Sequence, residues 1–115
     1  MLNFKTFISK PITVSAVEIS VDNIQEILFF YEEFLKRLFE KNKFLRFDLN
    51  DKYVDKYDLT IFTNTFKKDK YLLLEINKKA VFCLSNTDMF VMHEDGNVFS
   101  IVDQDDFKIQ FDYLT

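Results

Sequence analysis

The stretch FVMHEDGNVFSI, residues 90–101, contains the only glycine of this 115-residue chain and decides the local fold. Asp-Gly between two apolar runs is the strongest short-range signal for a two-residue hairpin turn. A turn at this dipeptide places Phe90 opposite Ile101 and Met92 opposite Phe99. Because opposed residues of a hairpin project to the same side, we expect these four side chains to form one core-facing surface.

Residues 22–42 predict one long amphipathic helix. Asp22 is suited to the N-cap position, and Gln25 stands three residues later, as in a capping box. Apolar residues recur at the spacing of a helical stripe, namely Ile24, Ile27, Leu28, Tyr31, Phe34, Leu35, Leu38 and Phe39. We expect this stripe to face the core.

The rest of the chain predicts strands. Alternating or continuous apolar patterns occupy residues 12–20, 44–49, 57–63, 71–76, 80–84 and 107–113. The apolar phase shifts between Ala16 and Val17, which predicts a β-bulge. One helix cannot cover seven to eight strands in an open layer. We therefore expect a single α+β domain, residues 1–115, with the helix packed on a strongly bent antiparallel sheet or a small partly open barrel.

The composition indicates a globular chain of the cytoplasm. Aromatic residues make up 17% and charged residues 30%, a balance that provides a core and a polar exterior. A lone cysteine, Cys83, cannot form an internal disulfide, which fits a reducing compartment. No apolar run reaches the 18 or so residues that a membrane span needs. We expect a cytoplasmic protein that does not insert in a membrane.

Acidic residues are concentrated at the end of the chain. Residues 86–115 carry seven acids against Lys108, whereas the formal net charge of the whole chain is −4. Such a field favours basic protein surfaces as partners, and the alternative is a solvated strand face with acidic turns. The acidic candidates for partner binding are Asp95, Asp103, Asp105 and Asp106.

Phe29 is the residue that fits a purely structural interpretation least well. At 100° per residue it falls on the polar side of the predicted helix, near Glu33. An aromatic residue ringed by charges is typical of protein interfaces, while a surface aromatic covered by a loop is the structural alternative. Phe29 and Glu33 complete the candidate partner-binding set, and a homodimer through Phe29 or a strand edge is compatible with it.

Both ends of the chain resemble a family of small, uncharacterised tailed-phage proteins. The start, KPITVSAVEI at residues 10–19, is similar to their KPVxVxA-like strand and is followed by a helix. The end, with residues 87–92 and the Asp-Gly hairpin, is similar to their PGDYI-like hairpin and aromatic closing strand. The resemblance implies a bacteriophage accessory protein made in the host cytoplasm. The family has no agreed activity, so it implies no catalytic residue.

The stock of catalytic groups is small, and we expect no enzyme activity and no cofactor. His93 is the only histidine, and the hairpin register places it on the face away from Phe90. Cys83 lies in an apolar strand, where a buried thiol acts as a small hydrophobe. The turn at residues 103–106 is rich in oxygen ligands but matches no calcium-loop spacing, so a solvated turn is expected rather than a metal site.

A basic cluster supplies an alternative function. Lysines beside aromatic residues can follow a nucleic-acid strand by charge and stacking, and the residues with this pattern are Phe66, Lys67, Lys68, Lys70 and Tyr71. The negative net charge and the scarcity of arginine count against nucleic acid. We therefore expect a non-enzymatic phage protein that binds and modulates a host protein, with a small-ligand, nucleotide or nucleic-acid module as the alternative and a minor virion or assembly protein as the second alternative.

Overall fold

The computed structural model describes residues 2–9, 12–93, 98–110 and 112–113. The chain forms two compact units. Unit 1 comprises Met1–Ser20 and Asn86–Thr115, and unit 2 comprises Val21–Ser85. Helices and antiparallel strands occur in both, so the α+β class is confirmed. The expectation of a single domain over residues 1–115 stays a prediction.

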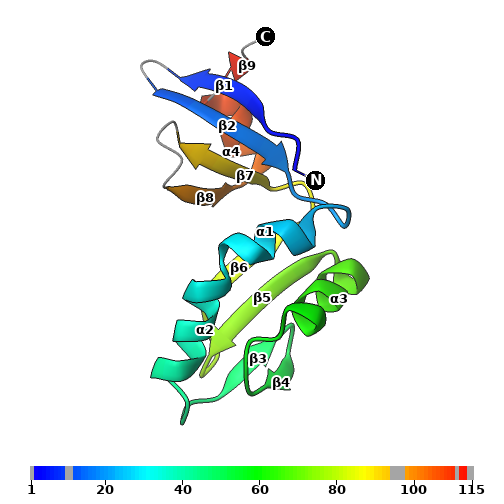
Figure 1. Ribbon diagram of the computed structural model, residues 1–115, viewed down its shortest axis with the longest axis vertical. Coiled ribbons are helices and arrows are strands. Elements are labelled where there is room, and N and C mark those ends of the chain that lie inside the picture. Colours follow the sequence, from blue (N-terminus) through cyan, green and yellow to red (C-terminus); the bar gives the residue numbers. More distant parts are fainter. Residues whose placement is uncertain (1, 10–11, 94–97, 111, 114–115) are drawn as a thin grey trace. The chain divides into compact units, whose positions relative to one another are not determined.

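Unit 1 contains an antiparallel sheet with one helix against it (Figure 1). The strand order in the described residues is β8-β7-β2-β1-β9. Helix α4 packs against one face because Phe107 clusters with Val14, Ala16, Met89 and Val91. The elements are β1 (Lys5–Ser9), β2 (Ile12–Glu18), β7 (Met89–His93), β8 (Phe99–Val102), α4 (Gln104–Gln110) and β9 (Asp112–Tyr113).

The hairpin register predicted from the Asp-Gly turn is confirmed. Phe90 pairs with Ile101 and Met92 with Phe99, while the turn residues 94–97, Asp95 among them, lie outside the described residues. Phe90 is fully buried and its ring stacks on Phe99 at 5.4 Å. The opposite face of β7 is buried as well, through Met89 and Val91, so both faces of this strand contribute to packing.

The predicted last strand, residues 107–113, is wrong over most of its length. Gln104–Gln110 form α4, and only Asp112–Tyr113 are extended. Asp103 Oδ1 accepts hydrogen bonds from the backbone N–H of Asp105 (2.9 Å) and of Asp106 (3.4 Å), which is the N-cap interaction that starts a helix. Ile109 is 83% exposed, although strict alternation would have buried it beside Phe107.

Unit 2 is inserted in the sequence between β2 and β7, which are paired strands of the unit 1 sheet. These strands are antiparallel neighbours, and Val14–Glu18 pair with Met89–His93 in a continuous register, so the predicted β-bulge is wrong. Beyond the strand ends, Ile19 N donates to Asp88 O at 2.8 Å and Thr87 N donates to Ile19 O at 2.9 Å. The chain therefore leaves unit 1 and re-enters it at adjacent backbone positions.

Unit 2 has a second antiparallel sheet, with strand order β4-β3-β5-β6 in the described residues (Figure 1). Asn50–Asp51 and Asn77–Lys78 have positive φ angles at both turn positions, which is the geometry of type I′ hairpin turns. The predicted hairpin across residues 71–84 is confirmed. The elements are α1 (Ile24–Phe30), α2 (Glu32–Lys41), β3 (Phe47–Leu49), β4 (Lys52–Val54), α3 (Leu59–Asp69), β5 (Tyr71–Ile76) and β6 (Lys79–Ser85).

The prediction of one long helix is wrong, because the helix breaks at Tyr31. Tyr31 N donates to Leu28 O, which closes α1 with a tight turn, and Tyr31 O accepts from Leu35 N at the start of α2. The Tyr31 ring packs edge-on against Phe82 of β6 at 5.2 Å. Asn23, rather than Asp22, is the N-cap residue of α1.

The predicted strand at residues 57–63 is wrong, because this segment begins helix α3. Asp58 Oδ1 accepts from Ile61 N at 3.1 Å and caps the helix. Phe62 and Phe66 are fully buried at helical spacing, whereas Ile61 is 47% exposed. The short alternating pattern thus coincided with a helical period that continues to residue 69.

The single bent sheet or partly open barrel of seven to eight strands is also wrong. The described strands divide between two separate sheets, five in unit 1 and four in unit 2. In unit 2, Phe47 of β3 stacks with Phe39 of α2 at 4.0 Å, so α2 covers the sheet face that also presents Phe82. The opposite face carries Asp48 and Glu75, which are register partners.

Candidate functional site

Three phenylalanines of unit 2 form an exposed apolar surface on α1 and α2. Phe29 is 65% exposed, Phe30 45% and Phe34 47%. We call these three residues the phenylalanine surface. The exposure expected for Phe29 is observed. Phe34 was expected on the buried stripe, and its 47% exposure corrects that expectation.

Two hollows flank the phenylalanine surface, and Phe30 lines both. The first, of about 470 Å³, is also lined by Phe29 and Leu59. The second, of about 410 Å³, is lined by Phe34 and Leu38 as well. The apolar surface is therefore continuous across the helix break.

Charged side chains surround this apolar strip. Asp22 and Glu26 line the first hollow, and Glu33, Arg37 and Lys41 line the second. Aromatic anchors inside a charged rim are the usual anatomy of a protein interface. Of the predicted partner-binding residues, the structure thus brings Phe29 and Glu33 to the same helical surface.

The acidic candidates of unit 1 have a structural role besides their charge. Asp103 caps α4, and Asp105 and Asp106 occupy its first turn, where negative charge interacts favourably with the helix dipole. All three residues are exposed. Asp95 lies outside the described residues.

The basic alternative site is only partly available for nucleic acid. Lys67, Lys68 and Lys70 are exposed at the end of α3, and Tyr71 is 38% exposed at the start of β5. Phe66 is fully buried in the core of unit 2, so its ring cannot stack on a base. Of the two aromatic residues predicted to stack on bases beside the lysines, only Tyr71 is accessible.

The two residues considered for nucleophilic or acid–base chemistry lie in different units. His93 pairs with Val14 on the face of unit 1 that α4 covers, and its side chain is half-buried. Cys83 pairs with Leu73 in unit 2 and is exposed, so the expectation of a buried thiol is wrong. Cys83 lies between the buried Phe82 and Leu84, so strand alternation directs its side chain to the opposite, exposed face of β6.

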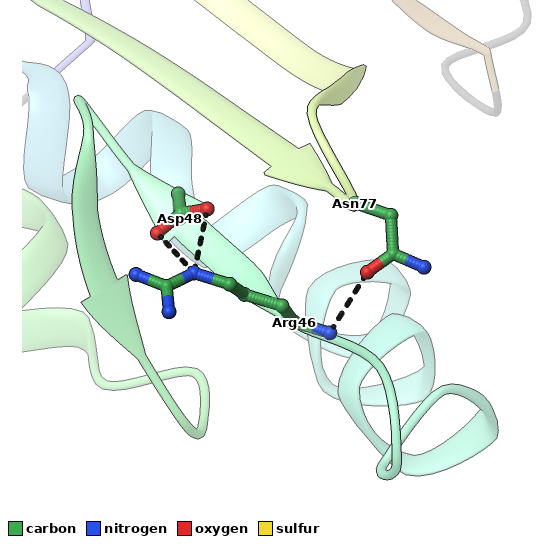
Figure 2. A network of polar contacts seen from close by, with 3 residues as sticks. All are labelled: Arg46, Asp48 and Asn77. Atoms are coloured by element: carbon green, nitrogen blue, oxygen red, sulfur yellow. Dashed lines mark hydrogen bonds and ion pairs between the residues drawn. The ribbon is translucent and has the colours of Figure 1, made fainter.

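The uncovered face of the unit 2 sheet has a polar cluster that is internally paired. Arg46 Nε contacts both Asp48 carboxylate oxygens at 3.2 Å, and Arg46 N donates to Asn77 Oδ1 at 3.2 Å (Figure 2). The Arg46 guanidinium also lies over the Tyr53 ring, 5.3 Å from its centroid. These contacts link Arg46, which precedes β3, to Tyr53 of β4 and to the turn between β5 and β6, which is a structural role.

Neither a metal centre nor a membrane span was found in the part of the chain that the structure describes. No group of three or more His, Cys, Asp or Glu residues is arranged to hold a metal ion there. None of the helices in those residues combines the length and hydropathy needed to cross a bilayer.

Comparison with known proteins did not assign this chain to a family. No family model, curated protein or solved structure matches this chain. The resemblance to tailed-phage proteins therefore stays a prediction.

Sequence reasoning missed the extent of the phenylalanine surface. The signal was the segment FFYEEF, residues 29–34, which has more aromatic residues than one helical stripe can bury. A second feature, an apolar hollow in unit 1, had no sequence signal, because its lining comes from β1, β2, β7 and α4.

Proposed function

We propose that this chain is a non-enzymatic accessory protein of a tailed bacteriophage that binds a host protein through the phenylalanine surface. The observation that carries the proposal is the exposure of Phe29, Phe30 and Phe34 together on α1 and α2. The phage setting rests on the resemblance of both chain ends to small tailed-phage proteins.

The size of this surface supports binding energetically. Burying a phenylalanine side chain contributes roughly 1.5–3 kcal/mol relative to leaving it exposed. Because Phe29, Phe30 and Phe34 are 45–65% exposed, complete burial of each would contribute about half of that, and together they offset part of the roughly 4–15 kcal/mol that association costs in lost freedom. Clustered aromatic anchors are also the residues that dominate measured interface energies.

The charge pattern indicates the kind of partner. The rim of the second hollow is basic at the end of α2, through Arg37 and Lys41, while Asp22 and Glu26 make the first hollow acidic. A complementary partner segment would have an apolar centre, basic residues facing the first hollow and acidic residues facing Arg37 and Lys41 of the second. Blocking a host enzyme or defence component by such contact requires no catalytic group.

Capture of host proteins by tagged variants tests the proposal. We expect wild type to retain a stoichiometric host protein from bacterial lysate and the double variant Phe29→Ala/Phe34→Ala to lose it. The matched control is Phe44→Ala, because Phe44 is 91% exposed in unit 2 but lines neither hollow. Surface substitutions usually change stability by less than about 0.5 kcal/mol, so all variants should remain folded.

Retention of the same host protein by Phe29→Ala/Phe34→Ala would contradict the proposed surface. Charge reversal at Asp105 and Asp106 separates the acidic contribution of unit 1. If the captured protein is lost only in that variant, the acidic end of the chain is the binding surface instead.

A further inference from the structure

Unit 1 contains a hollow of about 440 Å³ between α4 and the covered face of its sheet. Its apolar lining comes from three strands and the helix, through Phe7, Ala16, Met89 and Phe107. Volumes of this order are typical of sites for small ligands. All the residues that line the hollow belong to unit 1.

A small, buried residue, Ala16, is among the residues that line the hollow. Ala16 is 1% exposed and pairs with Lys5 on β1 and with Val91 on β7. Phe107 fills the adjacent space, where its ring meets Phe7 edge-on at 4.7 Å.

The rim of the hollow carries an excess of positive charge. Lys5 and Lys108 line it together with one carboxylate, that of Glu18. Glu18 Oε2 accepts a hydrogen bond from Gln104 Nε2 at 2.9 Å, which links β2 to α4. Gln104 and Lys108 are four residues apart and therefore project from the same side of the helix.

This positive rim contrasts with the rest of unit 1. The unit has eight acidic and three basic residues, a formal charge of −5, and two of the three basic residues line the hollow. The third, Lys10, lies outside the described residues. Cationic side chains above an apolar floor are the arrangement that receives an anionic head group on an apolar body.

We propose that this hollow binds a monocarboxylate with an aliphatic body, of the medium-chain fatty acid class. The aliphatic body lies against Phe7, Met89 and Phe107. The carboxylate meets the ammonium groups of Lys5 and Lys108 at the rim, where charge-assisted contacts are stronger than neutral ones. With Lys5, Lys108 and Glu18, the rim has a formal charge of +1, which matches a ligand with a single negative charge.

Isothermal titration calorimetry of the full chain with decanoate tests the proposal. Decanoate is kept below its micellar concentration, and the ionic strength is low. We expect saturable binding at one site. Lys108→Glu reverses the charge at the rim, so decanoate affinity should fall at least about tenfold. The matched control is Lys68→Glu, which reverses an exposed lysine in the last turn of another helix, α3, and should leave the affinity unchanged.

Exchanging the ligand charge distinguishes a specific site from general apolar binding. Decylammonium should bind wild type more weakly than decanoate, and Lys108→Glu should invert this order. Ala16→Leu should weaken both ligands by filling the floor, with circular dichroism used to verify that the variant is folded. Absence of saturable decanoate binding, or equal decanoate affinity in wild type and Lys108→Glu, would overturn the proposal.

Discussion

Asn50 and Asp69 are joined by a 3.0 Å hydrogen bond from Asn50 Nδ2 to Asp69 Oδ2. The same amide donates to Tyr71 O at 2.9 Å, and Asn50 Oδ1 accepts from Leu73 N at 2.7 Å. Asn50 stands at the turn between β3 and β4, with a φ of 50°, and is nearly buried. One side chain thus connects that turn to the end of α3 and to β5.

Substitution of Asn50 should therefore destabilise unit 2. Asn50→Ala removes three hydrogen bonds and takes away the Asn50 partner of the partly buried Tyr71 O and Leu73 N, so we expect a loss of about 2–3 kcal/mol in the free energy of unfolding. Asn50→Asp should cost more at neutral pH, because a second carboxylate would then face Asp69. Urea denaturation followed by circular dichroism measures both losses.

The matched control is Asn64→Ala, an exposed asparagine on α3. Alanine has the higher helix propensity, so this variant should be as stable as wild type or slightly more stable. If Asn50→Ala is as stable as Asn64→Ala, the amide of Asn50 does not hold the three elements together.

Alkaline pH should destabilise the fold through two tyrosines of unit 2. Burial raises the pKa of Tyr31 to about 12, and burial with the nearby charges of Glu32 and Asp58 raises the pKa of Tyr57 to about 12. Because the unfolded chain loses these protons near pH 10, this stability is complete below pH 10 and is lost as the pH rises toward 12.

Phenylalanine variants isolate this effect from other titrations. The buried hydroxyl of Tyr57 has no hydrogen-bond partner in the structure, so Tyr57→Phe should be at least as stable as wild type at pH 7. Urea midpoints between pH 8 and pH 11.5 should fall less steeply for Tyr57→Phe than for wild type. Identical slopes would mean that the phenol is ionised as easily in the folded state as in the unfolded chain.

Removal of unit 2 should leave a foldable unit 1. The backbone hydrogen bonds of Ile19 with Thr87 and Asp88 already close the β2–β7 hairpin. We expect a chain with Gly-Gly joining Ser20 to Asn86 to unfold cooperatively, as measured by thermal circular dichroism. A non-cooperative transition would support the single-domain prediction for residues 1–115, because the two units would then depend on each other.

Nucleic-acid binding should be weak and without specificity. Only lysine charge and Tyr71 remain available at the basic cluster, because Phe66 is buried. Fluorescence anisotropy with a labelled single-stranded oligonucleotide should show at most salt-sensitive binding that Lys67→Glu/Lys68→Glu abolishes. Salt-resistant, saturable binding would favour the nucleic-acid alternative over a protein partner.

The sequence by itself determined the parts of the fold that depend on neighbouring residues. The Asp-Gly hairpin predicted the pairing of Phe90 with Ile101, and the break at residues 77–79 predicted the β5–β6 hairpin. In both cases, a short turn and the strand alternation fix the register without help from distant segments. The exposure of Phe29 followed from helical geometry in the same way.

Local patterns misled where two periods fit the same short segment. Residues 57–63 alternate like a strand, yet the cap at Asp58 and the spacing of Phe62 and Phe66 belong to α3. No glycine or proline marks the helix break at Tyr31 in the sequence. At the break, the Tyr31 ring packs on Phe82, which is 51 residues later in the chain. Such choices depend on burial against strands that lie far along the chain.

Only the tertiary structure decided that β2 pairs with β7 although the whole of unit 2 separates them in the sequence, and that residues of β1, β2, β7 and α4 line one hollow. These features join residues with no short-range relation in sequence. Their stability comes from apolar burial, which is non-directional, so the apolar periodicity of each element does not specify which other element it packs against. Sequence patterns set the individual hairpins and helices, whereas packing selected their partners and placed the candidate sites.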